Sequence, residues 1–207
     1  DRNPVLEIVE VLSQEPSVTD YVALLLESAG GRLGKRKIHV GMYILSMHVP
    51  RLAEVLEFVQ YSRGVWSPQV ADAVSRLESA GIARVVRDKV ELAESEAARR
   101  AKIGGEELEL VREIGELLKL ATDDELLLYT YVLYGGDEKS DVKERVYSRR
   151  IDLAISLLQK GAVSFTLATR LAGLSPFELM EELEKRGIKP FAAEKEDIVH
   201  SSRNLAI

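Results

Sequence analysis

The sequence contains no cysteine among its 207 residues. This absence excludes disulfide bonds, thiol catalysis and zinc sites built on cysteine. No run of apolar residues approaches the roughly 20 that a membrane-spanning helix requires. The first residues, DRNPVLEIVE, lack the basic and apolar regions of a secretory signal. We therefore expect a cytoplasmic protein with no membrane partner.

Groups for catalysis and metal binding are also sparse. The three histidines lie far apart in the sequence, and neither a G-x-x-x-x-G-K-[ST] nor an H-E-x-x-H motif occurs. The carboxylate pairs Asp123–Asp124 and Glu181–Glu182 fall at a helix start or on a solvent face, where capping and solvation explain them. We expect no enzymatic activity, no cofactor and no metal site.

The composition is that of a folded chain with few amide side chains. Only two asparagines and four glutamines occur beside many charged residues, a balance typical of a thermophile. Apolar residues make up 46% of the sequence, which permits a normal core. The seven tyrosines, four phenylalanines and one tryptophan form no basic and aromatic platform, which disfavours a single-strand or RNA binder.

Charge is distributed unevenly along the chain. The net charge of −6 argues by itself against a nucleic-acid binder. Between Ala29 and Leu92, however, ten Lys or Arg residues stand against six Asp or Glu, a local balance of +4. The remainder has 18 basic and 28 acidic residues. Since a surface, and not the whole-chain average, contacts phosphates, the positive middle is the part to consider for DNA binding.

This middle region has the order of a winged helix. Ser67 caps a predicted helix over 68–80 with Pro68 at its first position, and Gly81 ends it. Residues 82–86 and 90–92 are predicted to be the two strands of a hairpin. In a winged helix the helix enters the major groove and the hairpin touches the DNA backbone, although such a hairpin can instead form a dimer contact. The predicted DNA-binding residues of this module are Gln69, Arg76, Arg84, Arg87 and Lys89.

A basic cluster precedes this module. Lys35, Arg36 and Lys37 stand at the start of a helix that Pro50 is expected to end. A cluster at a helix start can grip phosphates, and simple solvation is the equally open alternative. We include the three residues among the predicted DNA contacts.

Residues 163–187 have the layout of a helix-turn-helix. Gly173 ends the first helix, and Ser175 to Glu178 form a capping box that begins the second. Thr166, Arg170, Ser175 and Phe177 are the predicted DNA-binding residues here. The second helix is rich in glutamate, which phosphates would repel, so protein binding is the alternative. A helical corner that only packs a core is a further one.

The expected fold is mainly α, with an N-terminal winged helix-turn-helix and its short β-hairpin followed by a C-terminal helix-turn-helix bundle. The glycine pair Gly135–Gly136 marks the predicted boundary. Residues 1–136 would form a winged-helix-like domain with extra helices, and residues 137–207 a helix-turn-helix domain with a partner-binding tail. The apolar helix predicted over 126–134 is a candidate dimer seam. The predicted partner-binding residues of the tail are Phe191, Ile198 and Val199.

Two resemblances to families appear on these residues. Residues 150–197, with KGAVSFTLATRLAGLSPFELMEELEKRGIKP, resemble a small prokaryotic family of predicted antitoxins that contain a helix-turn-helix. The runs Leu171–Ser175 and Arg186–Ile188 match it, whereas Thr169 stands where the family usually has alanine. The upstream segments LLLESAGGRLGKRKIHVGMYIL and YSRGVWSPQVADAVSRLESAGIARV are similar to the Panacea-type antitoxin domain, with GVWSP in place of the usual GPYSP.

Both resemblances imply a regulator or antitoxin of a toxin–antitoxin operon. Together with the charge pattern, they predict a DNA-binding transcriptional regulator, an antitoxin-like autorepressor that binds double-stranded DNA, a cognate toxin and a second copy of itself. Two-fold symmetry in the protein would match two half-sites in the DNA. The alternative is a protein-interaction adaptor or dimerisation scaffold that does not touch DNA.

Overall fold

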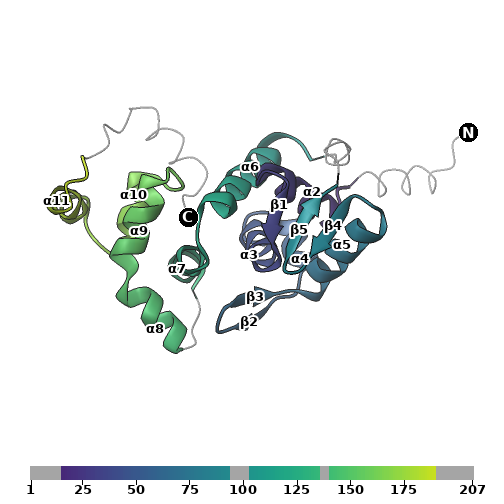
Figure 1. The fold of residues 1–207 in the computed structure, drawn as a ribbon, viewed down its shortest axis with the longest axis horizontal. Helices are drawn as coiled ribbons and strands as arrows, with labels where there is room; N and C mark the ends of the chain where they lie inside the picture. Colours follow the sequence, from purple (N-terminus) through teal and green to yellow (C-terminus); the bar gives the residue numbers. More distant parts are fainter. Residues whose placement is uncertain (1–14, 94–102, 136–139, 190–207) are drawn as a thin grey trace, which may run out of the picture. The chain divides into compact units, whose positions relative to one another are not determined.

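The computed structural model describes residues 15–93, 103–135 and 140–189 (Figure 1). The fold is mainly α, as expected, with ten helices and five short strands in these ranges. The sequence pattern also favours helices over residues 5–12 and 94–102, which lie outside the described residues. The chain divides into two compact units. The N-terminal unit comprises residues 1–60 and 65–119, and the C-terminal unit comprises residues 61–64 and 120–207.

The N-terminal unit has the element order of a winged helix. Its three-stranded antiparallel sheet has the order β1-β5-β4, with Leu33 opposite Val90 and Val85 also opposite Val90. The predicted hairpin is therefore confirmed, and a third strand from upstream completes the sheet. The elements are α2 (Val18–Ser28), β1 (Arg32–Gly34), α3 (Lys35–Ser46), α5 (Pro68–Ser79), β4 (Ala83–Val86) and β5 (Lys89–Leu92).

An insertion separates α3 from α5. It consists of α4 (Pro50–Val55) and a two-stranded sheet of β2 (Val59–Tyr61) and β3 (Gly64–Trp66). Pro50 does not end α3, as the sequence suggested. Helix α3 stops at Ser46, and Pro50 is the first residue of α4, where its fixed φ and missing N–H suit the helix start.

Buried apolar residues of α2 and α3 form the core of the N-terminal unit. Ser17 and Asp20 make a capping box at the start of α2, whose Tyr21 and Leu25 are fully buried. Helix α6 (Gly105–Leu120) closes the core and approaches the end of α2 at Gly115. A β-carbon at Gly115 would lie 2.9 Å from the carbonyl carbon of Ser28, so only glycine permits this approach.

The described regular elements of the C-terminal unit from residue 120 onward are all helices. The unit also includes the short segment 61–64. Arg149 separates α8 from α9, so Arg145 and Arg150 lie on two different helices. Helix α7 makes its contacts with α8, α9 and α10, and the division between units therefore falls between Lys119 and Leu120, earlier than Gly135–Gly136. The helices are α7 (Asp123–Tyr134), α8 (Asp141–Ser148), α9 (Arg150–Gln159), α10 (Phe165–Ala172) and α11 (Pro176–Lys185).

The turn between α10 and α11 follows the predicted helix-turn-helix pattern. Gly173 adopts a left-handed conformation with φ 68° and ends α10. Arg150 covers this turn: its Nε donates to the Leu171 carbonyl at 2.8 Å and its Nη2 to the Arg170 carbonyl at 3.2 Å. The Arg170 carbonyl also accepts from the Gly173 N–H at 3.3 Å, so Arg150 adds to the hydrogen bonds at the C-terminal end of α10, where the regular helical bonds stop. Ser175 then caps α11 with a capping box to Glu178.

Candidate nucleic-acid interface

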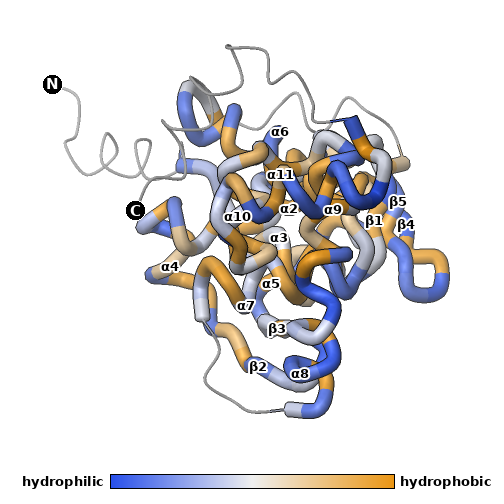
Figure 2. Tube along the Cα trace, turned by 90° about the vertical axis from the view of Figure 1, so that its left-hand side faces the viewer, coloured by the Kyte–Doolittle hydropathy of each residue, from blue (hydrophilic) through white to orange (hydrophobic). Residues whose placement is uncertain are grey.

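The hairpin of β4 and β5 is the wing of the N-terminal unit. Its turn consists of Arg87 and Asp88, with Val86 paired to Lys89 on either side. Arg87, Asp88 and Lys89 are all exposed, and the turn projects from the helices around it (Figure 2). Arg87 has φ 60°, the only non-glycine residue in the described ranges with a positive φ. The tip of the wing thus carries two cations, one of them held in a backbone conformation that favours glycine.

The start of α3 lies beside the turn of the wing. Gly34 pairs with Lys89, and the Lys35 backbone N–H donates to the Asp88 carbonyl at 2.7 Å. The side chains of Lys35 and Arg36 are exposed there. The structure therefore joins two clusters that are some fifty residues apart in the sequence into one surface. We call this surface the wing edge; its basic residues are Arg32, Lys35, Arg36, Arg84, Arg87 and Lys89.

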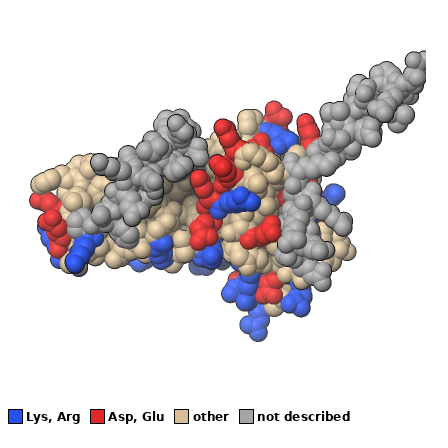
Figure 3. Space-filling model, turned by 90° about the horizontal axis from the view of Figure 1, so that it is seen from above, with Lys and Arg blue, Asp and Glu red and all other residues tan. Residues whose placement is uncertain are grey.

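Glu91 crosses the base of the wing edge. Its carboxylate accepts from Arg32 Nε at 2.9 Å and from Arg84 Nη2 at 3.4 Å, because both arginines lie opposite it in the sheet register. Both arginine side chains stay more than half exposed. One carboxylate shared by two guanidinium groups leaves this row of the sheet with a net positive charge. The space-filling view shows Lys and Arg gathered on a projecting part of the molecule (Figure 3).

Lys37 has a different environment from its two neighbours. Its side chain is half-buried, and its Nζ donates to the Leu118 carbonyl at 2.7 Å, near the end of α6. A cation at a helix C-terminus interacts favourably with the carbonyls exposed there. Of the three residues predicted together, Lys35 and Arg36 therefore lie on the wing edge, whereas Lys37 holds α6 in place.

The exposed face of α5 carries Gln69 and Arg76, the two residues predicted to read DNA. The Gln69 side-chain oxygen accepts from the Glu57 backbone N–H at 3.1 Å and from the Ser67 hydroxyl at 2.9 Å. Arg76 Nε donates to Asp72 at 2.7 Å, and its side chain is 71% exposed. The Arg76 contact thus lies within α5, and Gln69 joins the N-cap of α5 to the segment that follows α4.

His39 fixes the start of α5, a role that the sequence did not indicate. Its Nδ1 accepts from the backbone N–H of Ser67, the buried N-cap residue of α5, at 3.1 Å. Its ring also stacks on Trp66 with centroids 6.1 Å apart. Burial lowers the pKa of His39 from its ordinary 6.5 to about 4, since a charged imidazole loses its hydration there. His39 is therefore neutral near pH 7 and can accept this hydrogen bond.

The helix-turn-helix of the C-terminal unit offers a different surface. Thr166 and Arg170 are exposed on α10, and the Ser175 hydroxyl accepts from the Glu178 N–H as part of the cap. Phe177 is 72% exposed, more than any other large apolar residue in the described ranges. Glu178, Glu181 and Glu184 are exposed on the same helix; those carboxylates would repel phosphates.

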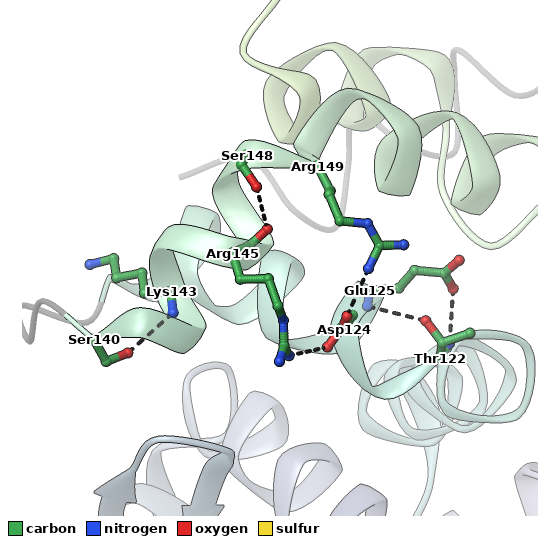
Figure 4. A network of polar contacts seen from close by, with 8 residues as sticks. All are labelled: Thr122, Asp124, Glu125, Ser140, Lys143, Arg145, Ser148 and Arg149. Carbon is green, nitrogen blue, oxygen red and sulfur yellow. Dashed lines mark hydrogen bonds and ion pairs between the residues drawn. The ribbon is translucent and has the colours of Figure 1, made fainter.

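Acidic side chains also organise the interior of the C-terminal unit. Glu125 is buried, and its carboxylate accepts from Lys160 Nζ at 2.9 Å, Ser156 Oγ at 2.6 Å and the Thr122 N–H at 2.8 Å. Burial raises the pKa of Glu125, but these hydrogen bonds and the Lys160 charge outweigh it and lower the pKa overall. Figure 4 shows the adjoining contacts, in which Asp124 pairs with Arg145 and Arg149. These arginines therefore stabilise the helical unit.

The predicted partner-binding residues Phe191, Ile198 and Val199 lie outside the described residues. Within residues 15–93, 103–135 and 140–189, no group of three His, Asp or Glu side chains could hold a metal ion. None of the helices described there is both long enough and apolar enough to cross a bilayer.

One family model matches part of the chain. Residues 138–206 are similar to an uncharacterised protein family, UPF0175. The match covers the segment from α8 onward, which contains the helix-turn-helix and overlaps residues 150–197, where the sequence resembles predicted antitoxins. No curated protein and no solved structure matches the chain.

Proposed function

We propose that this protein is a DNA-binding transcriptional regulator whose N-terminal unit contacts duplex DNA. The observation that supports it best is the wing edge, where a winged-helix topology gathers six basic side chains on a chain of net charge −6. Such a concentration of cations supplies the favourable, salt-dependent contacts that phosphates require. The acidic remainder keeps the rest of the surface from binding nucleic acid without specificity.

We further propose that it is an antitoxin-like autorepressor that acts as a homodimer and holds a cognate toxin protein through its C-terminal part. The support is the family resemblance together with the position of the matched family over residues 138–206. Two winged helices related by two-fold symmetry would place two wing edges along one duplex.

The test is a salt titration of the purified full chain against a fluorescent duplex from the region upstream of its own gene. With about five phosphate contacts, log affinity falls against log salt with a slope near −4 to −5. The matched control is an unrelated duplex of equal length, which shares the salt dependence but binds more weakly. Failure to bind either duplex at about 50 mM salt contradicts the proposal.

A protein-interaction adaptor is the second candidate, and α11 favours it. An exposed phenylalanine surrounded by exposed glutamates suits a protein surface with an apolar pocket and a basic rim better than it suits DNA. The two candidates separate in the same titration, because an adaptor shows little DNA binding at any salt concentration.

A further inference from the structure

We propose that the wing edge, and not the exposed face of α5, makes the principal contacts to duplex DNA. This inference rests on the proposed function and states which surface of the N-terminal unit performs it. In most winged helices the helix makes most of the DNA contacts and the wing makes fewer, so the proposal assigns the opposite roles here.

The first argument is the charge of α5. Between Pro68 and Ser79 the helix has one basic residue, Arg76, and two acidic ones, Asp72 and Glu78. Arg76 is paired to Asp72 at 2.7 Å, and the Glu78 carboxylate accepts from the Val85 N–H of the wing at 3.3 Å. With Gln69 engaged by Glu57 and Ser67, the helix presents no net positive charge to a phosphate backbone.

The second argument is the charge of the wing edge. The segments that form it, residues 32–36 and 84–91, contain six basic residues and two acidic ones, Asp88 and Glu91, and Glu91 is shared by Arg32 and Arg84. The Lys35–Asp88 backbone bond and the Gly34–Lys89 pairing keep the start of α3 and the turn of the wing together. The cations are thus carried on rigid elements, so that the backbone does not have to rearrange when they meet phosphates.

The third argument is the backbone of Arg87. A positive φ is unfavourable for a side chain with a β-carbon, and the surrounding sheet imposes it here. Glycine would occupy this position without strain. The arginine therefore adds a cation to the wing tip at a conformational cost, which is explained if the charge itself is needed there.

Arg87 also gives the inference a sharp test. The Arg87→Gly variant removes a charge and relieves the backbone, so its melting temperature equals or exceeds that of the wild type. In the titration described above, at about 100 mM salt, the double variant Arg87→Gly with Lys89→Gln binds the upstream duplex at least tenfold more weakly. Its salt slope is smaller by about two, one for each phosphate that the variant no longer neutralises.

Three variants serve as matched controls. Arg76→Gln and Gln69→Ala alter α5, and Arg112→Gln removes an equally exposed arginine from α6. Each is expected to change affinity less than threefold, because the wing edge stays intact.

The outcomes separate the inference from the proposed function. If Arg76→Gln or Gln69→Ala abolishes binding while the wing double variant binds as the wild type does, α5 is the interface and the inference is wrong, although the regulator stands. If the wild type shows no salt-dependent binding, the proposed function fails. If Arg112→Gln weakens binding as much as the wing variant does, the attraction is general and the wing edge has no special part.

Discussion

Helices α5 and α11 begin in the same way, but α5 belongs to a unit with a basic wing edge, whereas α11 is itself acidic. Each starts with a serine cap followed by proline, Ser67–Pro68 and Ser175–Pro176. Ser67 is buried, donates its backbone N–H to His39 and belongs to the unit that carries the basic wing edge, whereas Ser175 is exposed and precedes a helix rich in glutamate. A helix-turn-helix pattern therefore specifies a backbone path. The charges of the surrounding elements decide which partner the surface around that backbone can bind.

The largest effect on the C-terminal unit is expected from Glu125→Ala. The substitution removes a buried carboxylate and leaves the Lys160 ammonium and the Ser156 hydroxyl without it. The free energy of unfolding of this unit should fall by about 3 kcal/mol. Urea unfolding measures it, with exposed Glu184→Ala as the control at less than ~0.5 kcal/mol. The DNA affinity of this variant without urea should equal that of the wild type if the wing edge alone contacts DNA. A loss of DNA affinity would show that DNA binding also depends on the C-terminal unit.

The pH dependence of stability should distinguish the two units. The pKa of His39 is about 4 in the folded chain and 6.5 ordinarily, so the unfolded chain takes up its proton first as pH falls. The stabilisation is complete above pH 6.5 and is lost between pH 6.5 and about 4, by up to ~3 kcal/mol. The lowered pKa of His48 acts in the same direction. The pKa of Glu125 is also lowered, but from 4.5, so its contribution is lost only at more acid pH.

Trp66, the only tryptophan, reports on this transition because its ring stacks on His39. Its fluorescence in urea should show the N-terminal unit weakening between pH 6.5 and 4, and His39→Asn should flatten that dependence. An unfolding midpoint that does not move with pH in this window would show that His39 is not held neutral by folding.

A smaller effect is expected where α6 approaches α2. In Gly115→Ala the new methyl meets the backbone of Ser28, and overpacking should cost about 2 kcal/mol, more than the ~1 kcal/mol that alanine gains as a helix former. Gly104→Ala is the matched control, since a β-carbon there has nothing within 4 Å. Thermal unfolding followed by Trp66 measures both. Equal melting temperatures for the Gly115→Ala and Gly104→Ala variants would mean that α6 shifts easily to accommodate the methyl group. The N-terminal unit would then be less rigid than its packing indicates.

The smallest effect on stability should come from Phe177→Ala. The side chain is 72% exposed, so its removal should change the free energy of unfolding by less than ~0.5 kcal/mol. If α11 binds protein, the protein encoded by the neighbouring gene should no longer co-purify with this variant, while the variant still binds DNA. Loss of DNA binding instead would assign α11 to the DNA and remove the contrast with the wing edge.

Much of the local structure could be predicted because it depends on residues close in sequence. The capping boxes at Ser17, Thr122 and Ser175, the stop at Gly173 and the hairpin around Arg87 all follow from such short-range rules. The insertion is harder to predict, because the pattern of residues 51–60 fits a helix and a strand alike, and the structure uses both in turn, as α4 and β2.

The sequence by itself determined most of the helix caps, which residues are apolar enough to be buried, and that the positive charge lies in the middle of the chain. Only the tertiary structure decided that Lys35 and Arg36 join the wing, that Lys37 turns to the end of α6, and that Lys160 meets Glu125. These outcomes depend on contacts between residues up to 81 positions apart. Such contacts form because buried apolar surfaces bring the elements together, and no local pattern encodes them.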